Sequence, residues 1–285
     1  MFILGKVINC KEISEKLKED IKQFINERRN KGLIVPKISS ILVGNDGGSI
    51  YYLNSQEKIA TSLGVLFDKA ILEENITEDE LIDIINKLNC DESVQGIMIQ
   101  LPLPKHINEE KVVNTILSTK DIDCLTYENI GRLYSGNPEF LPCTPNAIMT
   151  VLKENNIDLS GKEVVVVGRS NIVGKPALQL LLNENATVTI CHSRTRDLKS
   201  VCKRADILVV AIGKPKFITA DYIKDDAIVL DVGTSSFDGK ITGDVDLEDV
   251  LDNVSMITKV PGGIGSITTT LLIKNVCEAI KKNEN

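Results

Sequence analysis

Histidine is scarce in this chain, and its cysteines follow no metal-binding spacing. The 285 residues include two histidines and seven cysteines, and no two cysteines form a C-x-x-C pair. Zinc sites are built from clusters of such ligands, so we expect no metal site. An odd number of scattered cysteines favours reduced thiols in a cytoplasmic protein over a disulfide framework.

Long apolar runs and an excess of basic charge are also absent. No segment approaches the roughly 18 apolar residues of a membrane span, and the apolar start MFIL is soon followed by charged residues, unlike a signal peptide. The net charge of −7 argues against nucleic acid or an anionic membrane as a partner. A hydrophobic content of 42% in 285 residues is enough for the cores of two compact domains.

The first half of the chain alternates between segments with strand and helix patterns. Apolar residues at helical spacing predict a first helix that ends near residues 31–32. The other segments are predicted strands at 37–44, 64–72 and 96–100 and predicted helices at 51–63 and 77–88. This alternation predicts an α/β domain around a parallel sheet.

The second half repeats the alternation after a less regular stretch at 120–142, which we interpret as the passage between domains. A helix at 145–155 precedes predicted strands at 164–167, 187–191, 207–211 and 227–232, and a terminal helix at 267–281 is expected to pack on the first domain. We therefore predict an α/β fold with two domains. The predicted domains are 1–142, completed by 266–285, and 143–265.

A glycine-containing turn follows the four valines of the strand at 164–167. Its sequence GRSNIVGKP departs from the standard G-x-G-x-x-G, because Gly168, Ser170 and Gly174 occupy the three glycine positions with one extra residue before the last. Backbone N–H groups in such a turn, together with the N-terminus of the next helix, can bind phosphate. The alternative is an ordinary tight turn with no ligand.

The residues after the next predicted strand favour a phosphorylated dinucleotide. A carboxylate near this point would bind the ribose 2′-hydroxyl of NAD, but none occurs before Asp197. Ser193 and Arg194 lie there instead, and Arg169 lies inside the glycine turn. Because guanidinium groups bind phosphate oxygens well, we predict NADP as the cofactor. A solvated basic helix start is the alternative, above all for Arg196.

Three residues of the first half have side chains that could bind or act on a substrate, at predicted strand ends or helix starts: Tyr52, Gln100 and Asp123. The carboxyl ends of parallel strands face the ligand crevice in open α/β sheets, which places Gln100 where it could bind a polar substrate. Taken singly, each has an ordinary alternative. A helical tyrosine is often part of a core, and a loop aspartate is often a turn or cap residue.

Several segments in order resemble the methylenetetrahydrofolate dehydrogenase/cyclohydrolase family, the FolD-type enzymes of one-carbon metabolism. The most specific segments are QLPLP at 100–104, PCTP at 142–145 and VPGGIG at 260–265. The resemblance implies a parallel-sheet α/β folate-binding domain and a Rossmann-type NADP-binding domain. It also implies a homodimer whose substrate is a folate, with a place in purine biosynthesis.

The resemblance assigns roles to individual positions. In the family pattern Asp123 matches the pterin-binding aspartate, Tyr52 the tyrosine that positions the folate ring, and Gln100 a glutamine of the same pocket. The implied substrate-binding residues are Tyr52, Gln100, Leu101, Asp123, Pro261, Gly262 and Gly263. The implied cofactor-binding residues are Gly168, Arg169, Ser170, Ile172, Gly174, Ser193, Arg194 and Thr234. The implied catalytic positions are Tyr52, Gln56, Gln100 and Asp123.

Gln56 is where the chain departs from the family pattern. The family's catalytic lysine lies four residues after the tyrosine, and this position holds Gln56. Lys58 is two residues further along, about 200° around the helix, and so faces elsewhere. A desolvated lysine can move protons, whereas glutamine does not titrate.

The two reactions of the family differ in how much proton transfer they need. Hydride transfer to NADP mainly requires orientation of donor and acceptor, whereas hydrolysis of the methenyl group requires successive proton transfers. We therefore predict a dehydrogenase with weak or no cyclohydrolase activity. The alternatives are a fully bifunctional enzyme, a shikimate dehydrogenase-like oxidoreductase, and a catalytically silent protein that binds NADP or folate.

Overall fold

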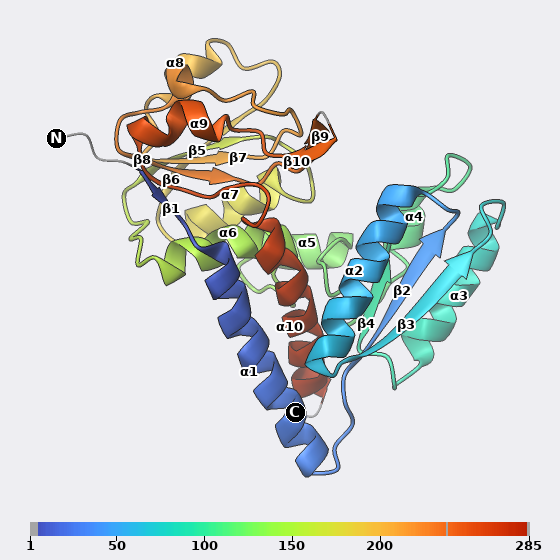
Figure 1. The fold of residues 1–285 in the computed structure, drawn as a ribbon. Coiled ribbons are helices and arrows are strands. Elements are labelled where there is room, and N and C mark those ends of the chain that lie inside the picture. The colour runs from blue at the N-terminus through green and yellow to red at the C-terminus, as the bar shows by residue number, and fades with distance from the viewer. Residues whose placement is uncertain (1–4, 238, 284–285) are drawn as a thin grey trace. The chain divides into compact units, whose positions relative to one another are not determined.

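The computed structural model of this protein describes residues 5–237 and 239–283, which form two compact units. Unit 1 comprises residues 5–15 and Pro142–Thr268, and unit 2 comprises Lys16–Leu141 and residues 269–283. Both units combine helices with a parallel sheet, so the predicted two-domain α/β fold is confirmed (Figure 1). Residues 1–4, 238 and 284–285, which the predicted domain ranges include, lie outside the described residues.

Unit 2 is built on a three-stranded parallel sheet with the strand order β3-β2-β4. The strands are β2 (Lys37–Val43), β3 (Leu66–Leu72) and β4 (Gly96–Ile99). The helices are α1 (Cys10–Asn30), most of which lies in this unit, α2 (Gly47–Leu63), α3 (Glu78–Cys90), α4 (Glu109–Val113), α5 (Tyr127–Tyr134) and α10 (Gly265–Asn283), whose greater part also lies here. Ile41, Leu81, Ile85 and Ile97 are among the buried side chains of its core.

Local capping explains where the helices of unit 2 begin and end. Asp46 caps α2 by accepting the backbone N–H of Ser49, and Gly64 ends the helix with φ of +85°, a left-handed conformation that suits glycine. Thr77 and Glu80 form a reciprocal capping box at the start of α3, as their spacing predicts. These caps fix both ends of α2 and the start of α3.

Unit 1 contains a six-stranded parallel sheet in the order β1-β11-β8-β7-β5-β6. Its strands are β1 (Lys6–Val7), β5 (Glu163–Val167), β6 (Thr187–Cys191), β7 (Ile207–Val210), β8 (Ala227–Asp231) and β11 (Val254–Ile257). The four valines of β5 are at most 1% exposed, as a strand covered on both faces requires. The chain continues from β5 to β6 on one side and then returns to β7 on the other side of β5. The loops at the carboxyl ends of these strands can therefore bind a ligand.

Shorter elements complete unit 1. The helices are α6 (Cys143–Glu154), α7 (Gly174–Asn183), α8 (Leu198–Cys202) and α9 (Leu247–Val250), with 3-10 turns at Ala220–Tyr222 and Leu251–Asn253. A separate antiparallel pair is formed by β9 (Ser235–Phe237) and β10 (Lys240–Thr242).

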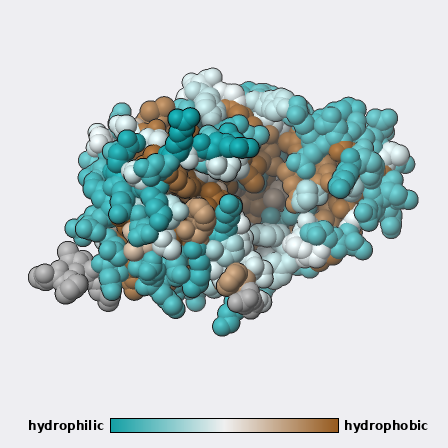
Figure 2. Space-filling model, turned by 90° about the horizontal axis from the view of Figure 1, so that it is seen from above, coloured by the Kyte–Doolittle hydropathy of each residue, from teal (hydrophilic) through white to brown (hydrophobic). Residues whose placement is uncertain are grey.

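The outer surface in view in Figure 2 is largely hydrophilic, with hydrophobic atoms in patches. None of the helices in the described residues combines the length and the apolar character of a membrane span. Among residues 5–237 and 239–283, no three His, Cys, Asp or Glu side chains are arranged to hold a metal ion.

The structure differs from the sequence expectations at several elements. The stretch at 120–142 contains α5 and is not irregular throughout, and the short strands β1 and β11 were not expected. Residues 5–15 lie in unit 1, whereas the predicted first domain included them, because β1 pairs with β11. The terminal helix, in contrast, agrees with its prediction: the greater part of α10 lies in unit 2, where Lys281 is 4.6 Å from the ring centre of Phe24 in α1.

Candidate active site

Two buried glutamines and a buried serine form a hydrogen-bonded group in unit 2. The Nε2 atom of Gln100 donates to Oε1 of Gln56 at 2.8 Å and to Oγ of Ser40 at 3.0 Å. Gln100 is 7% exposed, Gln56 is 9% exposed and Ser40 is 0% exposed. The structure thus brings together two predicted site residues and adds Ser40, which the sequence analysis did not single out.

Secondary structure explains how these side chains meet. Ser40 lies in the central strand β2, and Gln100 directly follows the neighbouring strand β4, where its backbone N–H bonds to Ile41 O at 2.8 Å. Gln56 comes from α2, one helical turn after Tyr52. The group therefore rests on two adjacent strands and one helix, which is a rigid support.

The group contains no residue that titrates near neutral pH. Amides and a serine hydroxyl neither bind nor release a proton there. Among residues 5–237 and 239–283, no lysine or other ionisable side chain hydrogen-bonds to Gln56 or Gln100, and Lys58 is exposed. Position 56 can orient a ligand through its amide but has no proton of its own to transfer.

Tyr52 lies on the exposed part of α2. Its side chain is 54% exposed, and its ring packs edge-to-face against Tyr51, with ring centres 6.3 Å apart and an angle of 85° between the planes. An exposed aromatic face one turn from a buried amide can stack on a planar ring while the amide binds its polar edge. This arrangement fits the position that the family resemblance assigns to Tyr52.

Asp123 is half-buried in the loop before α5, and Leu101 is half-buried against the core of unit 2. Cys124, next to Asp123, is 3% exposed and has φ of +59°. Burial, with Asp121 and Asp123 nearby, raises the pKa of this thiol well above its usual range. A thiol that stays protonated is a poor nucleophile, so Cys124 packs rather than reacts.

In unit 1 the predicted glycine turn connects β5 to α7, and two of its positions require glycine. A Cβ on Gly168, whose φ is +130°, would lie 2.2 Å from Ala211 O, and one on Gly174 would lie 2.1 Å from Gly168 O. Ser170 Oγ accepts the N–H groups of Val173 and Gly174 at 3.2 and 3.3 Å. The turn is therefore tightly closed at the start of α7.

The glycine turn leaves backbone donors available. Within the part of the chain that the structure describes, no acceptor bonds to the backbone N–H groups of four consecutive residues: Arg169, Ser170, Asn171 and Ile172. Ile172 is 56% exposed, and Arg169 and Ser170 are also exposed. Consecutive free N–H groups beside a helix N-terminus fit the phosphates of a dinucleotide.

The loop after β6 presents the predicted basic residues. The backbone N–H of His192 bonds to Thr195 Oγ1 at 2.8 Å, and that of Arg194 bonds to His192 Nδ1 at 3.0 Å. This tight turn leaves Ser193 and Arg194 exposed. A hydroxyl and a guanidinium beside the glycine turn fit an additional phosphate group.

Two further loops of unit 1 contain the remaining predicted residues. Thr234 is exposed after β8, and Pro261 and Gly262 are exposed in the loop after β11. Gly262 has φ of +86°, and a Cβ on Gly263 would lie 2.2 Å from Lys259 O, so both positions favour glycine.

Two buried carboxylates, which the sequence analysis did not single out, fix the loops of unit 1. Asp244 accepts the N–H groups of three consecutive residues, Ile212, Gly213 and Lys214, at 2.7–2.9 Å. Asp231 accepts those of Gly233, Asp244 and Val245, each at 3.0 Å. For Asp244 the segment GDVD was the available signal, but sequence alone does not tell a buried loop anchor from a surface turn.

These features define a class of protein. One unit has a parallel sheet with a glycine turn, free N–H groups and basic neighbours. The other is an α/β unit with a buried polar group that could bind a ligand. This combination is typical of a two-domain Rossmann-type nucleotide-dependent enzyme.

Comparison with known sequences identifies the family. Residues 8–123 match the tetrahydrofolate dehydrogenase/cyclohydrolase catalytic domain, and residues 142–284 match the NAD(P)-binding domain of the same family. The chain therefore belongs to the tetrahydrofolate dehydrogenase/cyclohydrolase family. This membership confirms the family resemblance and rejects the shikimate dehydrogenase-like alternative.

Individual relatives are similar over their full length. A bifunctional protein FolD from Clostridium botulinum is 66% identical over 99% of this chain and 100% of its own. The crystal structure of a bifunctional FolD methylenetetrahydrofolate dehydrogenase/cyclohydrolase from Campylobacter jejuni is 41% identical, with a TM-score of 0.96 and coverage of 98% of this chain and 99% of that one. A Trypanosoma brucei FolD, solved with NADP cofactor and inhibitor, is 33% identical with a TM-score of 0.93 and 99% coverage of both chains.

Proposed function

We propose that this protein is an NADP-dependent methylenetetrahydrofolate dehydrogenase that also acts as a methenyltetrahydrofolate cyclohydrolase. It would oxidise 5,10-methylenetetrahydrofolate to the 5,10-methenyl form and hydrolyse that product to 10-formyltetrahydrofolate, as part of one-carbon metabolism. The names of the relatives favour this fully bifunctional alternative over the sequence prediction of a dehydrogenase with weak or no cyclohydrolase.

The observation that carries the dehydrogenase half is the row of four free N–H groups at 169–172. They lie in a turn closed by Gly168 and Gly174, where any Cβ would collide with backbone. The residues that would hold NADP are Gly168, Arg169, Ser170, Ile172, Gly174, Ser193, Arg194 and Thr234. NADP, when bound, supplies the acceptor for the hydride that leaves the folate.

The folate would be held mainly by residues of unit 2. Tyr52 offers an exposed ring for stacking, Gln100 and Gln56 offer buried amides, and Asp123 offers a carboxylate for the amino groups of the pterin ring. We assign Leu101, Pro261, Gly262 and Gly263 to substrate binding on the same family pattern. These residues would bind and orient the folate, and orientation of donor and acceptor is the main requirement of hydride transfer.

A second candidate function is a dehydrogenase with little cyclohydrolase activity, and one observation favours it. Gln56 occupies the position of the family's catalytic lysine, and its amide is buried in a group that does not titrate. Addition of water to the methenyl group and ring opening need proton transfer at successive steps. A water-mediated route, or another side chain, would have to provide it if the enzyme is bifunctional.

Two assays on the purified protein test both candidates. Reduction of NADP on addition of 5,10-methylenetetrahydrofolate tests the dehydrogenase, and an absence of reduction with either NADP or NAD would favour the catalytically silent alternative. Decay of methenyltetrahydrofolate absorbance faster than in buffer alone supports the bifunctional enzyme. Decay at the buffer rate supports the second candidate.

The variant Gln56→Lys sharpens the test, with Asn54→Lys as its matched control. Both changes add one lysine to α2, but residue 56 is buried beside Gln100 and residue 54 is exposed. If position 56 limits the cyclohydrolase, only Gln56→Lys will accelerate methenyl hydrolysis, by about tenfold or more on the usual scale of acid–base catalysis.

We further propose a homodimer in the cytoplasm, with a place in purine biosynthesis, as the family resemblance implies. Sedimentation of the purified protein tests the oligomeric state.

A further inference from the structure

Asp121 is a buried carboxylate that holds both sides of the loop containing Asp123. It is 2% exposed, and its Oδ1 accepts the backbone N–H of Leu125 at 3.0 Å, whereas its Oδ2 accepts that of Thr126 at 2.8 Å. Its carbonyl oxygen accepts the N–H of Cys124 at 3.1 Å. Three successive amides after Asp123 therefore bond to one residue.

The loop is also anchored to its surroundings within unit 2. Asp121 forms a bridge with Ile97 of β4, which ties the start of the loop to the sheet. Asn275 of α10 donates Nδ2 to Ile122 O at 2.8 Å. The backbone on each side of Asp123 is thus fixed by these contacts.

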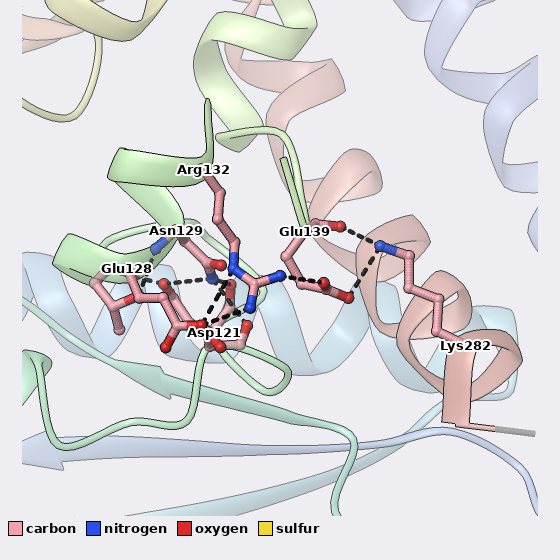
Figure 3. Close-up of polar contacts among 8 residues, drawn as sticks. Asp121, Glu128, Asn129, Arg132, Glu139 and Lys282 are labelled. Carbon is pink, nitrogen blue, oxygen red and sulfur yellow. Dashed lines mark hydrogen bonds and ion pairs between the residues drawn. The ribbon is translucent and has the colours of Figure 1, made fainter. Parts of the chain in front are cut away.

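Asn129 extends the same network into α5. Its side chain is fully buried, and its Nδ2 donates to Asp121 Oδ2 at 2.9 Å and to Ser118 O at 2.8 Å (Figure 3). Thr126 caps α5, because its Oγ1 accepts the N–H of Asn129 at 3.3 Å. The N-terminus of α5 and the end of the loop are therefore locked to one carboxylate, which amide donors rather than a cation stabilise.

We propose that Asp121 is a positioning residue for folate binding, which acts by fixing the 122–126 loop and so the direction of the Asp123 carboxylate. This inference rests on the proposed function, in which Asp123 binds the pterin ring. Cys124 has φ of +59°, a backbone conformation that residues other than glycine rarely adopt. The loop therefore needs contacts from outside to keep its shape.

A neighbouring ion-pair network provides a matched control. Glu128 pairs with Arg132 at 2.6 Å, Arg132 pairs with Glu139 at 3.3 Å, and Lys282 of α10 pairs with Glu139 at 3.0 Å (Figure 3). Glu128, Arg132 and Glu139 lie on the same segment as Asp121, but none of these ion pairs involves the backbone at 122–126. Glu128→Gln removes the same charge as Asp121→Asn and leaves the loop intact.

The test measures KM for methylenetetrahydrofolate and for NADP in Asp121→Asn and Glu128→Gln. Asparagine keeps one acceptor oxygen but turns an amino group toward an N–H donor, so the loop loses at least one bond. We expect Asp121→Asn to raise KM for the folate about tenfold and to leave KM for NADP within twofold. Glu128→Gln should change neither.

A double-mutant cycle separates positioning from a general structural role. If Asp121 acts through Asp123, adding Asp121→Asn to Asp123→Ala will raise the folate KM no further. Additive effects, or an equal rise in both KM values, would overturn the proposal. Wild-type protein without dehydrogenase activity would instead overturn the proposed function, so the two failures are distinguishable.

A folding defect in Asp121→Asn also has a defined outcome. Asp121→Glu keeps the charge and displaces the carboxylate by one methylene, and it should raise the folate KM in the same selective way. If neither variant yields folded protein that binds NADP, the residue serves the fold of unit 2 and the positioning role is rejected.

Discussion

The side-chain amide of Gln100 donates a 2.8 Å hydrogen bond to the side-chain oxygen of Gln56. Both residues are buried, and one follows strand β4 whereas the other lies on helix α2. The side chain of Gln56 is therefore held next to the amide at position 100. This contact makes residue 56 the point at which the two proposed reactions can be separated.

Ser40→Ala should weaken the support of Gln100. The change removes one of the two acceptors of Gln100 Nε2 and leaves Gln56 as the other. A net hydrogen bond contributes about 0.5–1.5 kcal/mol, so we expect unfolding free energy to fall by about 1 kcal/mol. The dehydrogenase kcat/KM should fall about three- to tenfold, measured by NADP reduction, because Gln100 is less well oriented.

Ser39→Ala is the control for this change. Ser39 is also buried in β2, but adjacent residues of a strand point to opposite faces of the sheet. Equal losses of kcat/KM in both variants would mean that Gln100 does not depend on Ser40.

Arg169→Ala and Arg194→Ala should change cofactor choice. Both arginines are exposed beside the free N–H groups of the glycine turn, where the phosphate on the ribose of NADP would bind. A hydrogen bond to a charged group is worth about 1.5–3 kcal/mol, so KM for NADP should rise about 10- to 100-fold. KM for NAD, which lacks this phosphate, should stay within about threefold.

Arg196→Ala tests the alternative of a solvated basic helix start. Arg196 is exposed two residues after Arg194 and carries the same charge. If a general positive potential explains NADP preference, all three variants will lose affinity to the same extent. If the phosphate is bound at defined positions, Arg196→Ala will keep the wild-type KM.

Long periodic segments allowed most of the fold to be predicted, whereas short ones did not. The predicted first helix and the valines at 164–167 correspond to α1 and β5, because their apolar spacing directly reflects burial. Strands β1 and β11 have two and four residues, and pairing with neighbours rather than sequence pattern makes them strands: β1 pairs with β11, and β11 also pairs with β8. Helix α5 contains Gly131, which weakens a helical prediction, and it buries only Asn129 and Leu133.

The sequence singled out polar residues whose side chains could bind a ligand, but not the residues that support the backbone around them. Gln56 and Gln100 are 44 residues apart in sequence, and the structure joins them. Ser40 and Asp121 were missed, because a serine in an apolar strand and an aspartate in a loop have common structural explanations. Only the tertiary fold shows which backbone groups a buried carboxylate binds.

Cys90 should be the thiol that reacts first in the native protein. It is exposed, whereas the other six cysteines are buried. Burial raises the pKa of Cys10 to about 11 and the pKa values of Cys202 and Cys277 to about 12, which leaves little reactive thiolate at neutral pH. A thiol reagent should therefore modify one fast group, and Cys90→Ser should abolish the fast phase. Two or more fast groups in the wild type, or any fast group that remains in that variant, would contradict the prediction.

Asp231 should give the protein an unusual dependence of stability on pH. Burial raises the pKa of its carboxyl from 3.8 to about 6, with the nearby Asp244 carboxylate adding to the rise and three backbone N–H donors opposing it. The folded state thus binds this proton more tightly than the unfolded state. The stability from this group is complete below about pH 4 and is lost as pH rises through 6.

The measurement compares urea unfolding of the wild type with that of Asp231→Asn between pH 4 and pH 7. Exposed carboxyls with lowered pKa values, such as Glu80 and Asp221, act in the opposite sense, but they are the same in both proteins and cancel in the difference. Since one pKa unit corresponds to about 1.4 kcal/mol, the advantage of the wild type should shrink by about 2–3 kcal/mol over this range. Asp225→Asn, an exposed charge change in the same unit, should give a flat difference. A difference for Asp231→Asn that is flat or grows with pH would show that this carboxyl is already ionised in the folded protein at pH 4.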